Sequence, residues 1–143
     1  MNKDIIKLWD KNNSKVLEWI KTVKNDIFSY ELLLKNTLRI IIGQTGIDTY
    51  ELPYHGRITH IDDGGYQGTL VFVIGGLVDI PTINDYWYTY VDYGSCSGSD
   101  TLLWIISGYD MSIYPSERQS KDYMALCLHM IQRMKKLAGD CDE

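Results

Sequence analysis

The sequence has no apolar run long enough to cross a membrane. Its longest runs, residues 70–74 and 102–106, are far shorter than the roughly 20 residues that span a bilayer. Residues 1–13 carry charges throughout and lack the apolar block and cleavage site of a secretion signal. We therefore expect neither a membrane segment nor a membrane partner.

Cysteine is scarce, and its pattern argues against a disulfide framework. The chain has an odd number of cysteines at wide spacings: Cys96, Cys127 and Cys141. This usage is typical of a protein in a reducing cytosol. No pair of Cys or His residues has the spacing of a zinc site, and Asp62 and Asp63 beside His60 are more simply turn residues. We predict no metal and no cofactor.

Basic residues are missing from the most aromatic part of the chain. No Lys or Arg lies between Arg57 and Arg118, and the formal net charge is −5. An acidic chain attracts nucleic-acid phosphates only through a local basic patch, and the sequence shows none. We therefore expect no direct nucleic-acid partner.

The chain is rich in apolar and aromatic side chains. Its 143 residues are 45% apolar and include 11 Tyr and 4 Trp. This length suits one domain with its own core, so we expect a single domain over residues 1–143. Tyrosine suits half-exposed surfaces and interfaces, because it buries area and keeps a polar group.

Two helices are predicted in the first third of the chain. The apolar spacing up to Asn25 indicates a helix that is interrupted or re-capped at Ser14. Residues 26–42 indicate a second helix that is capped at Asp26 and ends near Gly43.

A long final helix is predicted over residues 117–137. Ser116 and Gln119 have the spacing of a capping box at its start. Five of its residues should face the core: Tyr123, Cys127, Met130, Met134 and Leu137.

An antiparallel hairpin is the strongest β-sheet signal. Residues 57–61 and 68–74 flank an Asp-Asp-Gly-Gly turn, and the second arm is apolar on both faces, which places it in the middle of a sheet. Residues 86–93 indicate a third strand, and residues 43–56 a loop. The predicted fold is α+β, with a small antiparallel sheet of about three strands packed against N-terminal helices and a long C-terminal helix.

The third strand, YWYTYVDY, is aromatic on both faces. Strand alternation puts Tyr86, Tyr88 and Tyr90 on one face and the intervening residues on the other. One face should pack under the helices, and the other should expose aromatic side chains. The exposed stripe is either a binding surface or a cross-strand ladder that stabilises the sheet, and both interpretations stay open. The predicted protein-binding residues are Tyr86, Tyr88, Tyr90 and Asp92.

The loop that follows, Gly94-Ser95-Cys96-Ser97-Gly98, has the pattern of a nucleophile elbow with cysteine as the nucleophile. A base would have to come from His55, His60 or His129. However, the chain is too short for the fold in which that elbow normally occurs, and any tight strand-to-helix turn needs small residues. We predict no catalytic residue.

The same loop is an alternative ligand site. Backbone N–H groups ahead of a helix, together with serine hydroxyls, can hold an anion or a nucleotide. The residues involved would be Ser95, Cys96, Ser97, Ser99 and Asp100. Against this, the Asp100 carboxylate is placed to cap the helix that follows, where an anion would sit, and no Walker-type Gly-Lys-Ser or Gly-Lys-Thr is present. Structural capping is the preferred interpretation.

Two segments resemble small, uncharacterised proteins of bacteriophages that infect Gram-positive bacteria. They are IDDGGYQGT at residues 61–69 and YVDYGSCSGSDTL at residues 90–102. The resemblance extends loosely into residues 121–124 and the final helix. In that pattern a second Cys often stands where this chain has Ser99, which weakens any two-cysteine metal or redox role.

The resemblance implies a phage product that acts in the cytoplasm of a bacterial host. Small acidic phage proteins often bind and block a host or anti-phage defence protein, CRISPR nucleases included. The expected function is therefore non-enzymatic: an anti-CRISPR-like or other host-takeover inhibitor whose partner is a bacterial host or defence protein. An acidic, tyrosine-rich surface would suit a partner with a basic groove. Association of two copies is left open.

Overall fold

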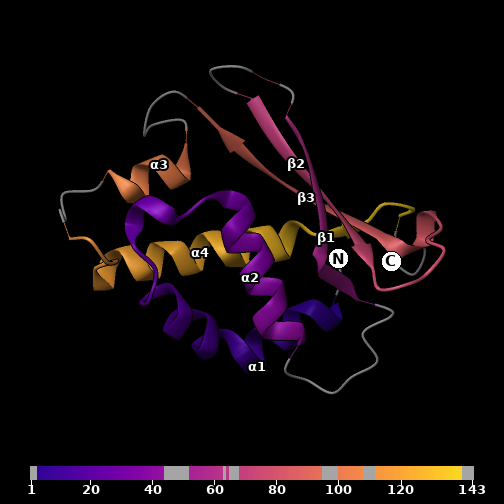
Figure 1. Cartoon of the computed structure of the whole chain (residues 1–143), viewed down its shortest axis with the longest axis horizontal. Coiled ribbons are helices and arrows are strands. Elements are labelled where there is room, and N and C mark those ends of the chain that lie inside the picture. Colours follow the sequence, from indigo (N-terminus) through magenta and orange to yellow (C-terminus); the bar gives the residue numbers. More distant parts are fainter. Residues whose placement is uncertain are drawn as a thin grey trace.

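The computed structural model describes residues 3–43, 52–62, 64, 68–94, 100–107 and 112–139. The fold is α+β, as predicted, with helices gathered on one side of an antiparallel sheet (Figure 1). The helices are α1 (Lys3–Ile20), α2 (Tyr30–Ile42), α3 (Thr101–Ile106) and α4 (Glu117–Arg133). The strands are β1 (Pro53–Asp62), β2 (Gly68–Gly76), β3 (Tyr86–Tyr93) and β4 (Lys135–Lys136). Short 3-10 helices cover Asn25–Ile27 and Ile83–Asp85. None of the described helices has the length and apolar character needed to span a membrane.

The sheet has the order β1-β2-β3-β4, and all neighbouring strands are antiparallel. The predicted hairpin is confirmed, and β2 lies inside the sheet as its apolar sequence indicates. The sequence predicts a loop over residues 43–56, but β1 begins at Pro53. The pairing register shifts between Pro53 and Ile58, and this bulge removes the regular alternation by which a strand is recognised in a sequence.

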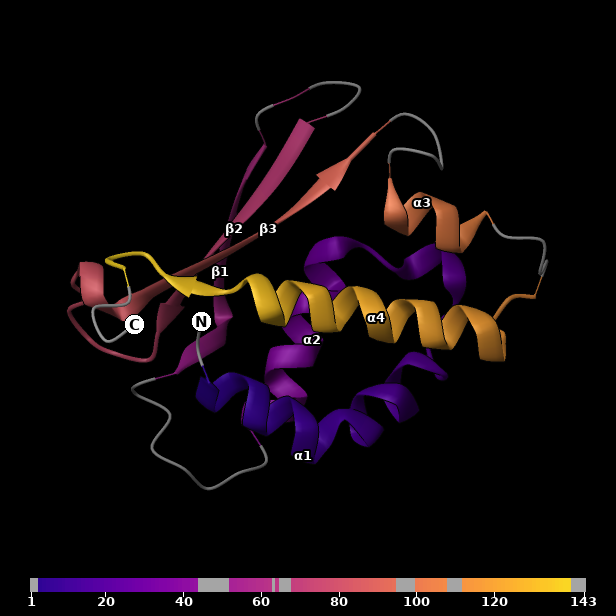
Figure 2. The ribbon, with the colours of Figure 1, turned by 180° about the vertical axis from the view of Figure 1, so that it is seen from behind.

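A fourth strand replaces the predicted last turn of the final helix. α4 ends at Arg133, and the Met134 backbone is extended while its side chain is fully buried. The next two residues form β4 and pair with Trp87 and Tyr88 of β3 (Figure 2). The edge of β3 has backbone N–H and C=O groups that an extended segment can pair with and a helical one cannot. This pairing favours a strand over a further turn of α4. Leu137, predicted to face the core, is 44% exposed as a result.

Helix α1 is continuous where the sequence predicts an interruption at Ser14. The buried Asn12 side chain donates a hydrogen bond to the Ile41 carbonyl, at 3.2 Å. This carbonyl is one of the last four of α2, which have no partner within their own helix. Asn12 therefore joins α1 to α2 without leaving the helical conformation.

Helix α2 begins later than predicted, at Tyr30. Its N-cap is Ser29, whose Oγ accepts a hydrogen bond from the Leu32 N–H at 3.0 Å, whereas Asp26 lies in the preceding 3-10 helix. The predicted end at Gly43 is confirmed, as is the Ser116 capping box of α4.

The inner face of the sheet forms the core with α2 and α4, and α1 packs on these two helices from the far side (Figure 1). Five strand residues on this face are nearly or fully buried: Phe72, Ile74, Trp87, Thr89 and Val91. The Thr89 hydroxyl donates to the Met130 carbonyl of α4 at 2.7 Å, which ties the last turns of the helix to β3. Because Trp87, Thr89 and Val91 face inward, Tyr86, Tyr88 and Tyr90 face outward.

Candidate functional site

The face of the sheet opposite the helices, which we call the outer sheet face, has none of the described helices packed on it (Figure 2). Its members follow from the strand register. They are Arg57, Thr59 and Ile61 on β1, Thr69, Val71, Val73 and Gly75 on β2, Tyr86, Tyr88, Tyr90 and Asp92 on β3, and Lys135 on β4. All four predicted protein-binding residues lie on this one face.

The tyrosines stand opposite small and aliphatic residues of β2 rather than opposite other aromatics. Tyr88 pairs with Val73 and Tyr90 with Val71. The valines are half-buried, while Tyr90 remains 38% exposed and Ile61 of β1 57% exposed. The stripe is thus a ladder of tyrosine on β-branched residues, with enough exposed area for contact with another molecule.

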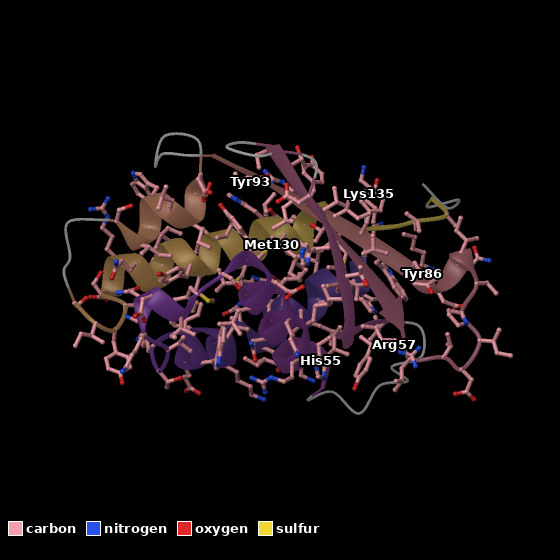
Figure 3. The ribbon with its side chains drawn as sticks, turned by 45° about the horizontal axis from the view of Figure 1, so that its top comes forward. His55, Arg57, Tyr86, Tyr93, Met130 and Lys135 are labelled. Carbon is pink, nitrogen blue, oxygen red and sulfur yellow. The ribbon has the colours of Figure 1, made fainter. Side chains whose placement is uncertain are left out.

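Arg57 and Tyr86 close over Gly75 at one end of the face. A methyl group at Gly75 would lie 3.4 Å from Tyr86 Cε1 and 3.5 Å from Arg57 Cβ. The Arg57 guanidinium donates from Nη1 to the carbonyls of Gly76, at 2.8 Å, and Val78, at 2.6 Å. Figure 3 shows Arg57 and Tyr86 at the same end of the sheet, with Tyr93 at the other. The arginine is therefore fixed beside the first tyrosine.

Arg133, in the last turn of α4, lies against Tyr90. Its guanidinium carbon is 5.1 Å from the centre of the Tyr90 ring, and its Nη1 donates to the Tyr90 carbonyl at 3.2 Å. The contact satisfies a carbonyl of β3 beyond the reach of β4 and covers one side of the ring with a cation.

The outer sheet face consequently carries cations that the linear sequence does not group. Arg57 comes from β1, Arg133 from α4 and Lys135 from β4, and Lys135 pairs directly with Tyr88. The sequence indicates no basic patch, because Arg57 lies far in the chain from Arg133 and Lys135, which are only two residues apart. The structure corrects that statement for this face.

The one acidic side chain on the outer sheet face by strand register, Asp92, lies at the end of the face opposite Tyr86. Asp92 accepts a hydrogen bond from the Thr69 hydroxyl at 3.0 Å. Asp62, at the end of β1, accepts hydrogen bonds from the Tyr93 hydroxyl and the Gly64 N–H. These two bonds, that of Tyr93 foremost, hold the pKa of Asp62 below its usual value. The face is therefore basic along its tyrosines and acidic at one end.

Asp100, in the alternative ligand site, is fully engaged by the protein. Its Oδ1 accepts from the Leu103 N–H at 3.1 Å and from the Tyr30 hydroxyl at 2.5 Å, and its Oδ2 accepts from the Gly94 N–H at 3.2 Å. The same Tyr30 hydroxyl accepts from the Leu102 N–H at 3.0 Å. The predicted cap is confirmed. The other members of this site, Ser95, Cys96, Ser97 and Ser99, lie outside the described residues.

Burial makes Tyr30 and Cys127 poor acids. Burial, followed by the hydrogen bond to Asp100, raises the pKa of Tyr30 well above its usual range. Burial raises the pKa of the Cys127 thiol to about 12, which keeps it protonated and unreactive at neutral pH. Within the described part of the chain, no three His, Cys, Asp or Glu side chains come together as metal ligands. His60 instead lies 3.5 Å from Glu31.

A second group of exposed apolar residues lies beside the start of α4. It consists of Leu103 and Trp104 on α3 and Ile113 and Tyr114 on the segment before α4. The Arg118 guanidinium lies 5.3 Å from the Trp104 ring centre. Trp104 is 44% exposed, close to the value for Tyr90, and this makes it a matched control for the outer sheet face.

Part of the outer sheet face could have been identified from the sequence. The alternation of Thr59 and Ile61, and of Val71 and Val73, already assigns each pair to one face of its strand. Lys135 could not have been included, because its place depends on where α4 ends.

No protein-family model, curated protein or solved structure matches the chain.

Proposed function

We propose that the protein is a non-enzymatic binding protein that docks a partner protein on the outer sheet face. The observation that carries the proposal is the composition of this face, where tyrosine, valine and isoleucine lie together with no described helix over them. The solvent face of an antiparallel sheet is ordinarily polar, and contiguous exposed apolar and aromatic side chains mark interaction sites. Tyrosine is also among the residues that contribute most to binding energy at interfaces.

The described part of the chain supports binding better than catalysis. The Cys127 thiol is buried and protonated, and both oxygens of Asp100 serve the fold. A small molecule at residues 94–101 would have to compete with these hydrogen bonds. The alternative of a nucleotide or small-molecule site therefore gains no support from Asp100.

The class of partner is proposed from the resemblance to phage proteins. That resemblance supports a bacterial host or anti-phage defence protein, an anti-CRISPR role among the possibilities, and action in the host cytoplasm. The biological effect would be inhibition of the bound protein.

Affinity capture from bacterial lysate, with mass spectrometry of the captured proteins, tests the proposal. The bait is the wild-type chain, a Tyr88→Thr/Tyr90→Thr variant, or a Trp104→Gln control. Threonine keeps the strand preference of the two positions, and circular dichroism checks that each bait is folded. Loss of one interface tyrosine that is a hot spot costs about 2 kcal/mol, or roughly a thirty-fold weaker Kd.

The tyrosine variant should therefore lose a partner that wild type and the Trp104→Gln control both retain. If the tyrosine variant retains the partner and the Trp104→Gln control loses it, the binding site lies on the α3 side of the molecule instead.

A further inference from the structure

We infer that the partner segment docked on the outer sheet face is acidic, with carboxylates that pair with Arg57, Arg133 and Lys135. This inference rests on the proposed function, because it specifies the chemistry of the partner at the same site. It also reverses an expectation from the sequence, in which the net negative charge of the chain favours a basic partner.

Each outward tyrosine has its own cation. Arg57 lies beside Tyr86, and Lys135 pairs with Tyr88. The third cation, Arg133, lies over Tyr90. Arg57 on β1 and the neighbouring residues Arg133 and Lys135, at the end of α4 and on β4, bring these charges to one row of side chains.

The three cations have no carboxylate partner among the described residues. The ion pairs found there join His60 to Glu31 and Arg118 to Asp122, on other parts of the molecule. The one acidic member of the face, Asp92, lies at its far end and bonds to Thr69. The positive charge along the tyrosines is thus available to an incoming group of opposite sign.

The outer sheet face suits an acidic protein segment better than a single-stranded nucleic acid. Bases bind such faces by stacking on open aromatic rings, but Arg133 already covers one side of Tyr90, the most exposed of the three tyrosines. Around the tyrosines the face offers Val71, Val73 and Ile61, which suit aliphatic side chains.

Fluorescence anisotropy with defined probes tests the inference. The probes are a short labelled peptide that alternates Glu with Val, the same peptide with Gln in place of Glu, and a labelled oligothymidylate of equal charge. The proteins are wild type, Arg133→Gln, Lys135→Gln and the control Lys11→Gln, which removes one exposed positive charge from α1.

The Glu peptide should bind more tightly than the Gln peptide and the oligothymidylate. Its Kd should rise roughly two- to five-fold in Arg133→Gln and in Lys135→Gln, as expected for exposed ion pairs, and should not change in Lys11→Gln. Added salt should raise the Kd of the Glu peptide towards the Kd of the Gln peptide, because salt screens the ion pairs.

Three outcomes would overturn the inference: equal Kd values for the Glu and Gln peptides, tighter binding of the oligothymidylate, or no binding of the Glu peptide. If capture from lysate still depends on Tyr88 and Tyr90, any of these outcomes leaves the proposed function standing. If capture does not depend on Tyr88 and Tyr90, both the proposed function and this inference are wrong.

Discussion

Replacement of Asp100 by alanine should destabilise the protein markedly, because one carboxylate serves three donors from separate parts of the chain. It caps α3 through the Leu103 N–H, bonds the Gly94 N–H at the end of β3, and accepts from the Tyr30 hydroxyl of α2. The variant would leave all three donors without this acceptor.

The expected loss is about 2–4 kcal/mol in the free energy of unfolding. Removal of an aspartate N-cap costs about 1 kcal/mol. The Tyr30 side chain is buried, and a buried hydroxyl left without its acceptor costs a further 1–3 kcal/mol or so. Asp100→Asn should cost less, because the amide oxygen can still accept from the Leu103 N–H and the Tyr30 hydroxyl, and only the Gly94 N–H loses its acceptor.

Urea unfolding followed by tryptophan fluorescence measures these losses. Tyr30→Phe is the matched variant, since it removes only the hydroxyl between Asp100 and the Leu102 N–H. The double variant completes a cycle, and the coupling energy between the two side chains should be about 1 kcal/mol or more, because they are in direct contact.

A loss below about 0.5 kcal/mol for Asp100→Ala, the range of an ordinary surface substitution, would refute this reasoning. The carboxylate would then not be needed by the fold. A ligand role for the loop at residues 94–101 would become the better explanation of its sequence.

Three further predictions concern buried polar groups. Thr89→Val should lower the free energy of urea unfolding by about 1–3 kcal/mol, because the Met130 carbonyl loses its buried hydroxyl donor; an unchanged value would contradict that bond's role. Asn25→Ala should cost at least about 2 kcal/mol in the same assay, since Asn25 bonds both Gln119 and the Tyr123 hydroxyl. The control Asn13→Ala removes an exposed contact and should be nearly neutral. The Cys127 thiol has a pKa of about 12 when folded and an ordinary value of 9.0, so the unfolded chain loses this proton first and stability falls as pH rises between these values. In that window the slope of unfolding free energy against pH should be shallower in Cys127→Ala by about 1.4 kcal/mol per pH unit, and parallel slopes would exclude a buried thiol.

Short-range rules predicted β3 with its correct bounds, the Asp100 cap ahead of α3, and the hairpin with shorter arms than β1 and β2 have. β3 is marked by strict alternation, and α3 by the Asp100 cap and the apolar residues that follow it. The hairpin of β1 and β2 follows from its turn residues and from the apolar second arm. In each case the deciding interactions lie within a few residues of one another.

The errors arose where a distant part of the chain decides the outcome. In the sequence, Asn12 indicates a break in the helix. In the fold its side chain bonds the Ile41 carbonyl of α2, and the helix continues. The end of α4 depends on the edge of β3, which offers β4 two pairing positions. The tyrosines of the candidate site could be predicted, because they alternate within one strand. The cations beside them could not, because their positions depend on contacts between distant parts of the chain.

Photo-crosslinking in bacterial cells tests the role of the outer sheet face most directly. The photoreactive residue p-benzoylphenylalanine replaces Tyr90 in one variant and Trp104 in the other, two positions of similar exposure on different sides of the molecule. Irradiation should join position 90, and not position 104, to a discrete protein partner that mass spectrometry identifies. Crosslinks from position 104 alone would contradict a binding role for the outer sheet face.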